Sequence, residues 1–239
     1  MSRLISFIKR LIYPETYSQD AYISALRNKY HVDIGHDCRI YSPNQTFIDK
    51  QRGHMLHIGN YCKITRNVTI LTHDYSRGVC CSIPGGEYGN VGEAAYTFIG
   101  DNVFIGVNAT ILMGAHIGNN SIVGAGAVVS GHFPDSVVIA GNPAKVVCSL
   151  DEHYQKRKAK EVESAKEYVH CWRKTYGKDP SILEMTNAFS WLYIPHTKES
   201  IDKYPEFFDL SAVDKEVLYT NFLESKPLYQ SFEEFLADC

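Results

Sequence analysis

Aliphatic residues recur at every sixth position through the middle of the chain. The series comprises Ile99, Ile105, Ile111, Ile117, Val123 and Val129. Small or slender residues stand four positions after most of them, at Val103, Ala109, Ala115, Ser121 and Ala127. A period of six fits neither a helix, which repeats every 3.6 residues, nor an open strand, which alternates every two. The pattern therefore predicts short strands separated by regular turns.

A hexapeptide that forms one strand and one turn is one side of a coil. Three of them make a triangular coil of about 18 residues, in which side chains one coil apart stack on one another. The aliphatic side chains then point inward, and glycine or asparagine at the turns tolerates positive φ. Earlier aliphatic positions follow the same spacing, at Ile34, Ile40, Ile58, Ile64 and Ile70. We expect a mainly β chain with a parallel β-helix over residues 31–150.

The period breaks once. Ile70 and Ile99 are 29 residues apart, which is not a multiple of six. A loop excursion is therefore expected near residues 75–96, where Pro84 and the following glycines are typical of loops. Pro143 is expected to end the strand pattern, because proline cannot donate a hydrogen bond to a ladder.

Both ends of the chain are expected to be helical. Residues 151–239 form the predicted C-terminal extension, with one long helix over 151–176 and shorter ones near 182–193, 213–223 and 232–236. Residues 1–30 form an N-terminal helical segment, in which apolar residues of 3–12 share one helical face. That face packs either on this or a neighbouring subunit or, with its few basic residues, on a membrane surface. Lys9 and Arg10 interrupt the apolar run that a signal peptide needs.

Composition limits the classes of partner and the cellular compartment expected for this chain. The chain has 239 residues, 44% of them hydrophobic, and a formal net charge of -3. Its basic residues form no long stripe, which argues against a nucleic-acid partner. Seven cysteines without a CxxC pair are typical of free thiols in a reducing compartment, so we expect a cytoplasmic protein.

Three segments resemble a known family. They are residues 99–106 (IGDNVFIG), 117–129 (IGNNSIVGAGAVV) and 140–145 (AGNPAK). They resemble the hexapeptide-repeat acyltransferases, and among these the galactoside and maltose O-acetyltransferases and their relatives in O-antigen and capsule synthesis. The likeness covers about 32–147. It implies a left-handed β-helix with three hexapeptides per coil, acetyl-CoA as the acyl donor, a sugar or glycan acceptor and a homotrimer.

His73 is the candidate catalytic residue, in the sequence Thr72-His73-Asp74. In the family that these residues resemble, a histidine in this setting removes the proton from the acceptor hydroxyl. A hydroxyl attacks a thioester poorly unless a base takes its proton, and imidazole titrates near neutral pH. The alternative is a surface histidine at a loop edge. Asp74 either orients the ring, contacts the acceptor or is a simple turn residue.

The resemblance also implies residues for the donor and the acceptor. Phe104 occupies an aromatic place beside the cofactor, and Val107 and Ala125 occupy corners whose backbone touches the pantetheine arm. Lys145 is expected at the nucleotide phosphate, unless it is simply solvated. Ser130 and Gly131 replace a usual Thr-Lys pair, so a phosphate contact is missing or comes from His132. The last implied position is Asn44 at the sugar, whose alternative is a turn residue beside Pro43.

Other functions fit the same coil. A β-helix can be an inert scaffold, which would need neither His73 nor Lys145. γ-Class carbonic anhydrases use such a coil with zinc, but their His-x4-His pair is absent, and His54 and His57 are the nearest substitute. We expect no metal. Acetyl transfer to an amine remains an alternative to transfer to a hydroxyl, and the acceptor sugar is undetermined.

Overall fold

The structure is a computed structural model, and it describes residues 11–86 and 88–239. The chain divides into two compact units, Met1–Asp151 and Glu152–Cys239. The amphipathic segment expected over residues 3–12 lies almost entirely outside the described residues. None of the helices in the described ranges is long and apolar enough to cross a membrane.

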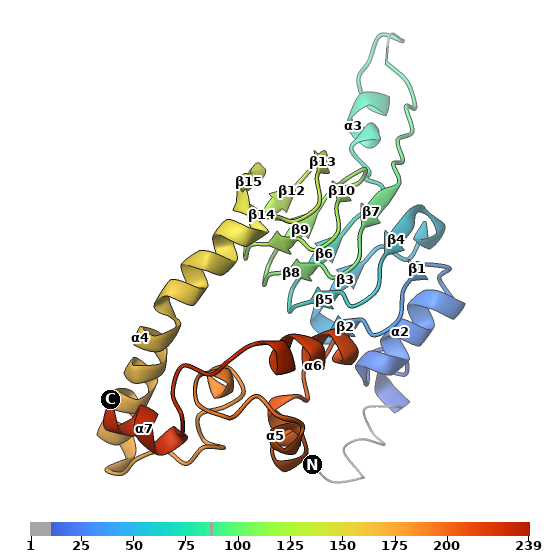
Figure 1. The fold of residues 1–239 in the computed structure, drawn as a ribbon. Helices are drawn as coiled ribbons and strands as arrows, with labels where there is room; N and C mark the ends of the chain where they lie inside the picture. The colour runs from blue at the N-terminus through green and yellow to red at the C-terminus, as the bar shows by residue number, and fades with distance from the viewer. Residues whose placement is uncertain (1–10, 87) are drawn as a thin grey trace. The chain divides into compact units, whose positions relative to one another are not determined.

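The first unit is a parallel β-helix built from three sheets, as the period of six predicts (Figure 1). The first sheet contains β1 (Asp33–Ile34), β4 (Leu56–Ile58), β7 (Thr97–Ile99), β10 (His116–Ile117) and β13 (His132–Phe133). The second contains β2 (Arg39–Ile40), β5 (Lys63–Ile64), β8 (Phe104–Ile105), β11 (Ile122–Val123), β14 (Val137–Gly141) and β15 (Ala144–Ser149). The third contains β3 (Phe47–Ile48), β6 (Thr69–Ile70), β9 (Thr110–Ile111) and β12 (Val128–Val129). From β1 to β14, successive strands visit the three sheets in turn, so three strands complete one coil.

The register explains the period. Ile99 pairs with Ile117 on the first sheet and Ile105 with Val123 on the second. All four side chains are fully buried inside the coil. Each coil places its inward residue directly against the inward residue of the next coil. The stacked aliphatic side chains are thereby removed from water together. The hydrophobic core of this unit is therefore a set of vertical ladders.

A glycine follows the inward aliphatic residue of the first sheet because the next coil fills the space beside it. A Cβ on Gly100 would lie 2.6 Å from Asn119 Oδ1 and 2.9 Å from Asn119 N. Asn119 Oδ1 accepts a hydrogen bond from the Asp101 backbone N–H at 2.8 Å. In the same way, the Asn60 backbone N–H donates to Asp101 Oδ1 and the Asn119 backbone N–H donates to Asp135 Oδ1, each at 2.7 Å. The Ile-Gly pairs thus leave room for a ladder of Asn and Asp side chains along one corner.

The chain leaves the coil between β6 and β7 and returns in register. This excursion carries the short helix α3 (Arg77–Cys81), which projects from the coil in Figure 1. After it, Phe98 pairs with His57 on the first sheet. Two earlier corners contain the 3-10 turns η1 (Pro43–Gln45) and η2 (Gly53–Met55). The first of these irregular corners borders the candidate site.

Helix α2 (Gln19–Asn28) lies against the first coil. Its N-terminus is capped by Ser18, whose side chain accepts from the Ala21 N–H. Tyr22 and Leu26 are buried in the same core as the ladder residues. Arg27 Nη2 donates to the carbonyls of Ile34 and Gly35, each at 2.9 Å. The helix therefore covers apolar surface that would be exposed at the start of the coil.

The expectation that Pro143 ends the strand pattern was wrong. β14 and β15 form an antiparallel hairpin in which Gly141 pairs with Ala144. Pro143 lies in the turn between them, where its missing N–H costs no ladder hydrogen bond. The strand pattern therefore continues to Ser149.

The second unit contains the C-terminal helices. The long helix α4 (Leu150–Tyr176) leads into it from the coil and is followed by α5 (Lys198–Lys203), α6 (Lys215–Glu224) and α7 (Phe232–Ala237). Phe222 and Phe235 are fully buried in an aromatic core with Tyr193. The helix predicted over 182–193 was wrong: that segment is mostly turns and includes the 3-10 turn η3 (Ser190–Leu192). A second 3-10 turn, η4 (Pro205–Phe207), precedes α6.

Candidate active site

The candidate site lies at the corner where the chain passes from the third sheet to the first. Asp49 directly follows β3, and His73 follows β6 by three residues. β3 and β6 are neighbours, with Ile48 paired to Ile70. Both polar side chains are nonetheless buried, with exposed fractions of 2% for Asp49 and 8% for His73. Burial of an ionisable pair requires hydrogen bonds, and these are present.

Asp49 is held by a set of hydrogen bonds. Its Oδ2 accepts from His73 Nδ1 at 2.5 Å, from Thr72 Oγ1 at 2.5 Å and from Thr72 N at 3.2 Å. Its Oδ1 accepts from the Gln51 N–H at 3.0 Å. Burial raises the pKa of Asp49, but the hydrogen bonds from Thr72, Gln51 and His73 outweigh burial and hold the pKa below its usual value. Asp49 is therefore a carboxylate at neutral pH.

This carboxylate fixes the state of the imidazole. The Asp49 carboxylate accepts a hydrogen bond from His73 Nδ1. In the neutral ring the proton therefore lies on Nδ1, and the free lone pair lies on Nε2. Nε2 is buried and has no hydrogen-bond partner within the described ranges. A buried polar atom without a partner is costly unless a ligand or water satisfies it. His73 thus presents an available base, oriented by a buried carboxylate.

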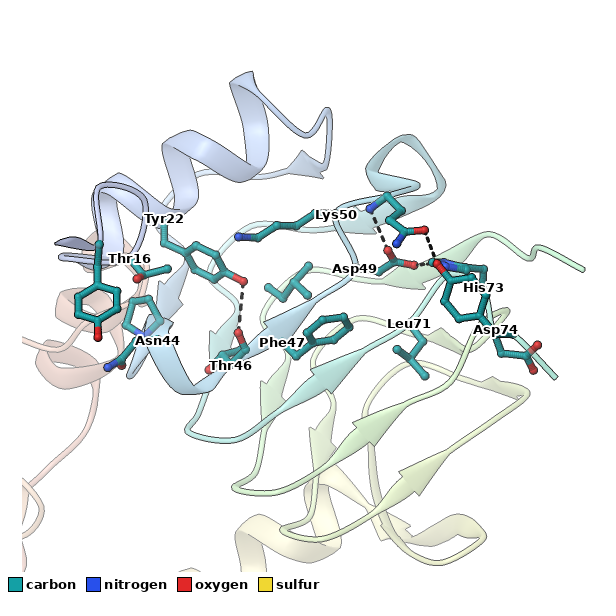
Figure 2. A pocket seen from close by; sticks show the side chains of 15 residues that line it. Thr16, Tyr22, Asn44, Thr46, Phe47, Asp49, Lys50, Leu71, His73 and Asp74 are labelled. Atoms are coloured by element: carbon teal, nitrogen blue, oxygen red, sulfur yellow. Dashed lines mark hydrogen bonds and ion pairs between the residues drawn. The ribbon is translucent and has the colours of Figure 1, made fainter. Parts of the chain in front are cut away.

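A cavity of about 760 Å³ adjoins this pair (Figure 2). Its described lining includes Asn44, His73 and Asp74, so the structure brings together the three residues predicted for the acceptor side. Asn44 lies toward one end of the cavity and His73 and Asp74 toward the other, with Phe47 between them. The remaining described lining is Tyr13, Thr16, Tyr22, Pro43, Thr46, Ile48, Asp49, Lys50, Gln51, Leu71 and Tyr75.

The residue that orients the imidazole is Asp49, which the sequence interpretation missed. Asp74 instead accepts at Oδ1 from the backbone N–H of Ser76 at 3.0 Å and from Ser76 Oγ at 2.9 Å. It forms a turn at the start of the excursion and belongs to the lining at the His73 end of the cavity. Ile48 pairs with Ile70, an offset of 22 residues that is not a multiple of six. Asp49 and His73 themselves are 24 residues apart, the spacing of the Ile34–Ile58 pair, so a multiple of six was the signal that could have linked them although the strands before them pair out of that period.

The predicted donor residues lie on other parts of the coil. Phe104 is on the outer face of β8 and is 39% exposed. Val107 and Ala125 occupy stacked corners after β8 and β11, where the Gly126 N–H donates to the Val107 carbonyl at 2.9 Å. None of the six donor residues belongs to the described lining of the cavity around His73.

The other donor residues lie near the end of the coil. Ser130 and Gly131 form the corner after β12, on the same corner of the coil as His73. Gly131 has a φ of +83° and open space where a Cβ would lie. Lys145 is exposed on β15. Gly126 has a φ of +70°, and no atom lies within 4 Å of the place where a Cβ would be added. Open backbone at two corners and an exposed cation are compatible with an amide arm that carries an anionic end.

Metal ligation has no support in the geometry of the described residues. They contain no cluster of three or more His, Cys, Asp or Glu side chains that could hold a metal ion. His57, one of the two histidines considered from sequence, hydrogen-bonds through Nδ1 to Asp33 Oδ2 at 2.7 Å.

Comparison with known proteins assigns the family. Residues 96–130 match a family model described as "Hexapeptide repeat of succinyl-transferase". Protein CapG of Staphylococcus aureus is 38% identical over 128 residues, which cover 54% of this chain and 72% of that protein. The chain belongs to the hexapeptide-repeat acyltransferase family.

Other members of the family match shorter stretches. A 2,3,4,5-tetrahydropyridine-2,6-dicarboxylate N-acetyltransferase of Clostridium perfringens (strain SM101 / Type A) is 54% identical over 54 residues, 23% of each chain. WbbJ of Escherichia coli (strain K12), provisionally named a lipopolysaccharide biosynthesis O-acetyl transferase, is 47% identical over 55 residues, 23% of this chain and 28% of that protein. The chain thus spans less than a third of these two acyltransferases.

Among solved structures, a galactoside acetyltransferase in complex with coenzyme A matches at 23% identity and a TM-score of 0.44. The match covers 64% of this chain and 82% of that chain.

Proposed function

We propose that this hexapeptide-repeat acyltransferase moves an acetyl group from acetyl-CoA to a hydroxyl of a sugar, with His73 as the general base. The observation that supports this most is the Asp49–His73 pair beside a cavity that Asn44 and Asp74 also line. Asp49 leaves the imidazole lone pair on Nε2, which is the atom that must take the proton. The same family includes relatives named for acetyl transfer.

The proposed reaction is a direct displacement. The acceptor oxygen attacks the thioester carbonyl carbon while its proton passes to His73 Nε2, and a tetrahedral oxyanion forms. Collapse of that intermediate breaks the carbon–sulfur bond, and the departing thiolate takes the proton from the imidazolium. Asp49 stabilises the transient imidazolium charge across its 2.5 Å hydrogen bond. The products are the acetyl ester and free CoA, with His73 restored.

The donor would occupy the later coils. Phe104 and the backbone of Val107, Ala125, Ser130 and Gly131 are the proposed contacts for the pantetheine arm, and Lys145 is proposed for a phosphate. Because these residues lie outside the cavity around His73, we propose a homotrimer in which neighbouring coils complete each site. We also propose the left-handed coil of the family and a cytoplasmic location, which suits seven free cysteines.

An amine acceptor is the second candidate, because one matching relative is named an N-acetyltransferase. The two products differ chemically: alkaline hydroxylamine cleaves an acetyl ester but leaves an acetamide intact. Treatment of the purified product therefore assigns the acceptor atom.

The direct test is acetyl-CoA-dependent release of free CoA with a panel of sugars, amino sugars and lipid-linked glycans. His73→Ala should lower kcat by about 100-fold or more, because it removes the base. His116→Ala is a matched control, since this histidine is exposed on the outer face of β10, and it should retain activity. Absence of CoA release with every acceptor, together with absence of CoA binding, would contradict the proposal and favour a scaffold.

A further inference from the structure

The cavity beside His73 is large for a single sugar ring. Its volume is about 760 Å³, within the range of roughly 300–1,000 Å³ that encloses a drug-sized ligand. Figure 2 shows that it extends from His73 and Asp74, past Phe47, toward Asn44 and Thr16. A ligand that places one hydroxyl at His73 therefore leaves the Asn44 end for further groups.

Phe47 lies in the middle of this cavity. It stands on the outward face of β3, and 58% of the residue is exposed. The outward residues at the equivalent positions of β6, β9 and β12 are Thr69, Thr110 and Val128. Phe47 is therefore the large apolar side chain on this face, and an aromatic ring in a concave site gains most when a flat apolar surface covers it. The C–H face of a pyranose ring is such a surface.

The Asn44 end adds further aromatic and hydroxyl groups. Tyr22 is buried, and its hydroxyl donates to the Thr46 carbonyl at 3.3 Å. Tyr13, 56% exposed, and Thr16 complete this end of the described lining. At the other end, Tyr75 donates to Gln51 Oε1 at 2.6 Å and packs edge-on at 5.1 Å from the ring of His73. Aromatic rings mixed with hydroxyl and amide groups suit a polyhydroxylated ligand that is longer than one ring.

The charges of the cavity disfavour a phosphate. Lys50 is the one cationic side chain among the described lining residues, and its Nζ lies 3.2 Å from Glu15 Oε2. The same ammonium lies 5.1 Å from the centre of the Tyr22 ring and 4.8 Å from that of Tyr30. Asp74, a second charged residue with a carboxylate, also belongs to the described lining at the His73 end. A diphosphate placed here would meet a carboxylate and a cation that is already paired, so the transfer of its charge from water would go uncompensated.

We infer that the acceptor part of this cavity binds an uncharged oligosaccharide of at least two sugar units, with one ring stacked on Phe47 and the next directed toward Asn44. The inference rests on the proposed function, because it takes His73 as the point of acetylation. It separates a free or lipid-linked glycan from a nucleotide diphosphate sugar, whose charged portion the cavity does not match.

Direct binding tests this inference without acetyl transfer. Calorimetric titration of the full chain, without acetyl-CoA, would compare glucose, maltose, maltotriose, N-acetylglucosamine, chitobiose and chitotriose with UDP-N-acetylglucosamine. The best neutral oligosaccharide should bind about 10-fold or more tightly than its monosaccharide and than the nucleotide sugar. Tighter binding of the nucleotide sugar, equal binding of one and two units, or failure of every oligosaccharide to bind would overturn the inference.

Variants at Phe47 test the stacking. Phe47→Ala should weaken oligosaccharide binding about 10-fold, whereas Phe47→Tyr, which keeps the ring, should stay within about 3-fold. Tyr154→Ala is the matched control, because Tyr154 lies on α4 and is similarly exposed at 56%. Equal binding by the wild type and Phe47→Ala, with both chains folded in a thermal unfolding scan, would refute the stacking.

The two proposals fail separately. Oligosaccharide binding without acetyl transfer would contradict the acetyltransferase function and preserve the ligand class. Efficient acetylation of a nucleotide sugar would support the acetyltransferase function and contradict the ligand class. His73→Ala should lose the transfer but keep the preference for two sugar units over one, because the stacking on Phe47 does not depend on the base.

Discussion

Asp49 Oδ2 lies 2.5 Å from His73 Nδ1, and the two residues come from corners of successive coils. The backbone N–H and the hydroxyl of Thr72 bind the same carboxylate oxygen. The carboxylate is thus fixed from two directions before any substrate arrives. It determines both the orientation of the imidazole and the nitrogen that carries its proton.

Replacement of Asp49 should therefore impair the chemical step. In Asp49→Asn the amide can donate to Nδ1, which favours the tautomer with the proton on Nε2 and removes the free lone pair from the reacting side. We expect kcat to fall by about 100-fold or more with a much smaller change in KM, measured by CoA release.

Asp74→Asn is the control for Asp49→Asn. Its carboxylate binds Ser76 rather than His73, so the substitution should lower kcat by less than about 10-fold. Equal losses of kcat in the two variants would mean that Asp49 has no special role in orienting the base.

The Asn and Asp ladder predicts a strict need for glycine at position 100. The Cβ of Gly100→Ala would lie 2.6 Å from Asn119 Oδ1, so the coils must separate or lose the hydrogen bond from Asp101. We expect the free energy of unfolding to fall by about 1–3 kcal/mol in denaturant titrations. Gly78→Ala, where nothing lies within 4 Å of the added Cβ, should be close to neutral. Two equally stable variants would rule out the ladder explanation.

The ion pairs of Glu15 predict a pH-dependent contribution to stability. Hydrogen bonds from Lys29 and Tyr30, followed by Lys50, lower the pKa of Glu15 from 4.5 to about 2. A carboxyl whose folded pKa is depressed stabilises the fold fully above its unfolded pKa, and this contribution is lost as the pH falls from about 4.5 toward 2. Glu15→Gln should therefore be less stable than the wild type at pH 7, with the difference shrinking toward pH 2.

Unfolding midpoints at pH 7, 4 and 3 measure this effect. Glu163→Gln on α4, an exposed glutamate, should track the wild type at each pH. A stability gap for Glu15→Gln that stays constant between pH 7 and pH 3 would contradict the assignment to Glu15.

A buried hydroxyl in the second unit predicts a substitution that does not lower stability. Tyr193 is 1% exposed, and its hydroxyl oxygen has no hydrogen-bond partner within the part of the chain that the structure describes. Burial raises the pKa of Tyr193, as expected for a phenol away from water. Tyr193→Phe should therefore leave the free energy of unfolding unchanged or raise it by about 1 kcal/mol.

Tyr168→Phe is the matched comparison within the same unit. Its hydroxyl donates to the Glu184 carbonyl at 2.7 Å, so its removal should cost about 1 kcal/mol. A greater loss for Tyr193→Phe than for Tyr168→Phe would indicate a partner for the Tyr193 hydroxyl.

The hexapeptide pattern predicted the coil because its cause is local and repeated. Ile99, Ile105 and Ile111 occupy inward positions on three successive sheets, and each pairs with the residue 18 positions later. Burial of every sixth side chain leaves a periodic trace that one sequence is enough to reveal. The histidine beside the break in that period was recognisable for the same reason, because the chain leaves the coil there.

The remaining features depend on contacts that the hexapeptide period alone does not specify. Pro143 lies in a hairpin because β15 turns back along β14, a choice that proline chemistry permits but does not dictate. Asp49 meets His73 because β3 and β6 are neighbouring strands and both residues lie in the corner beyond them, His73 two residues past the position that the strand register aligns with Asp49. The sequence by itself determined the repeating coil and the identity of a candidate base. Only the tertiary structure decided which carboxylate orients that base and which aromatic ring lies in the cavity beside it, because those side chains lie on irregular corners and outward faces whose contacts the hexapeptide period does not specify.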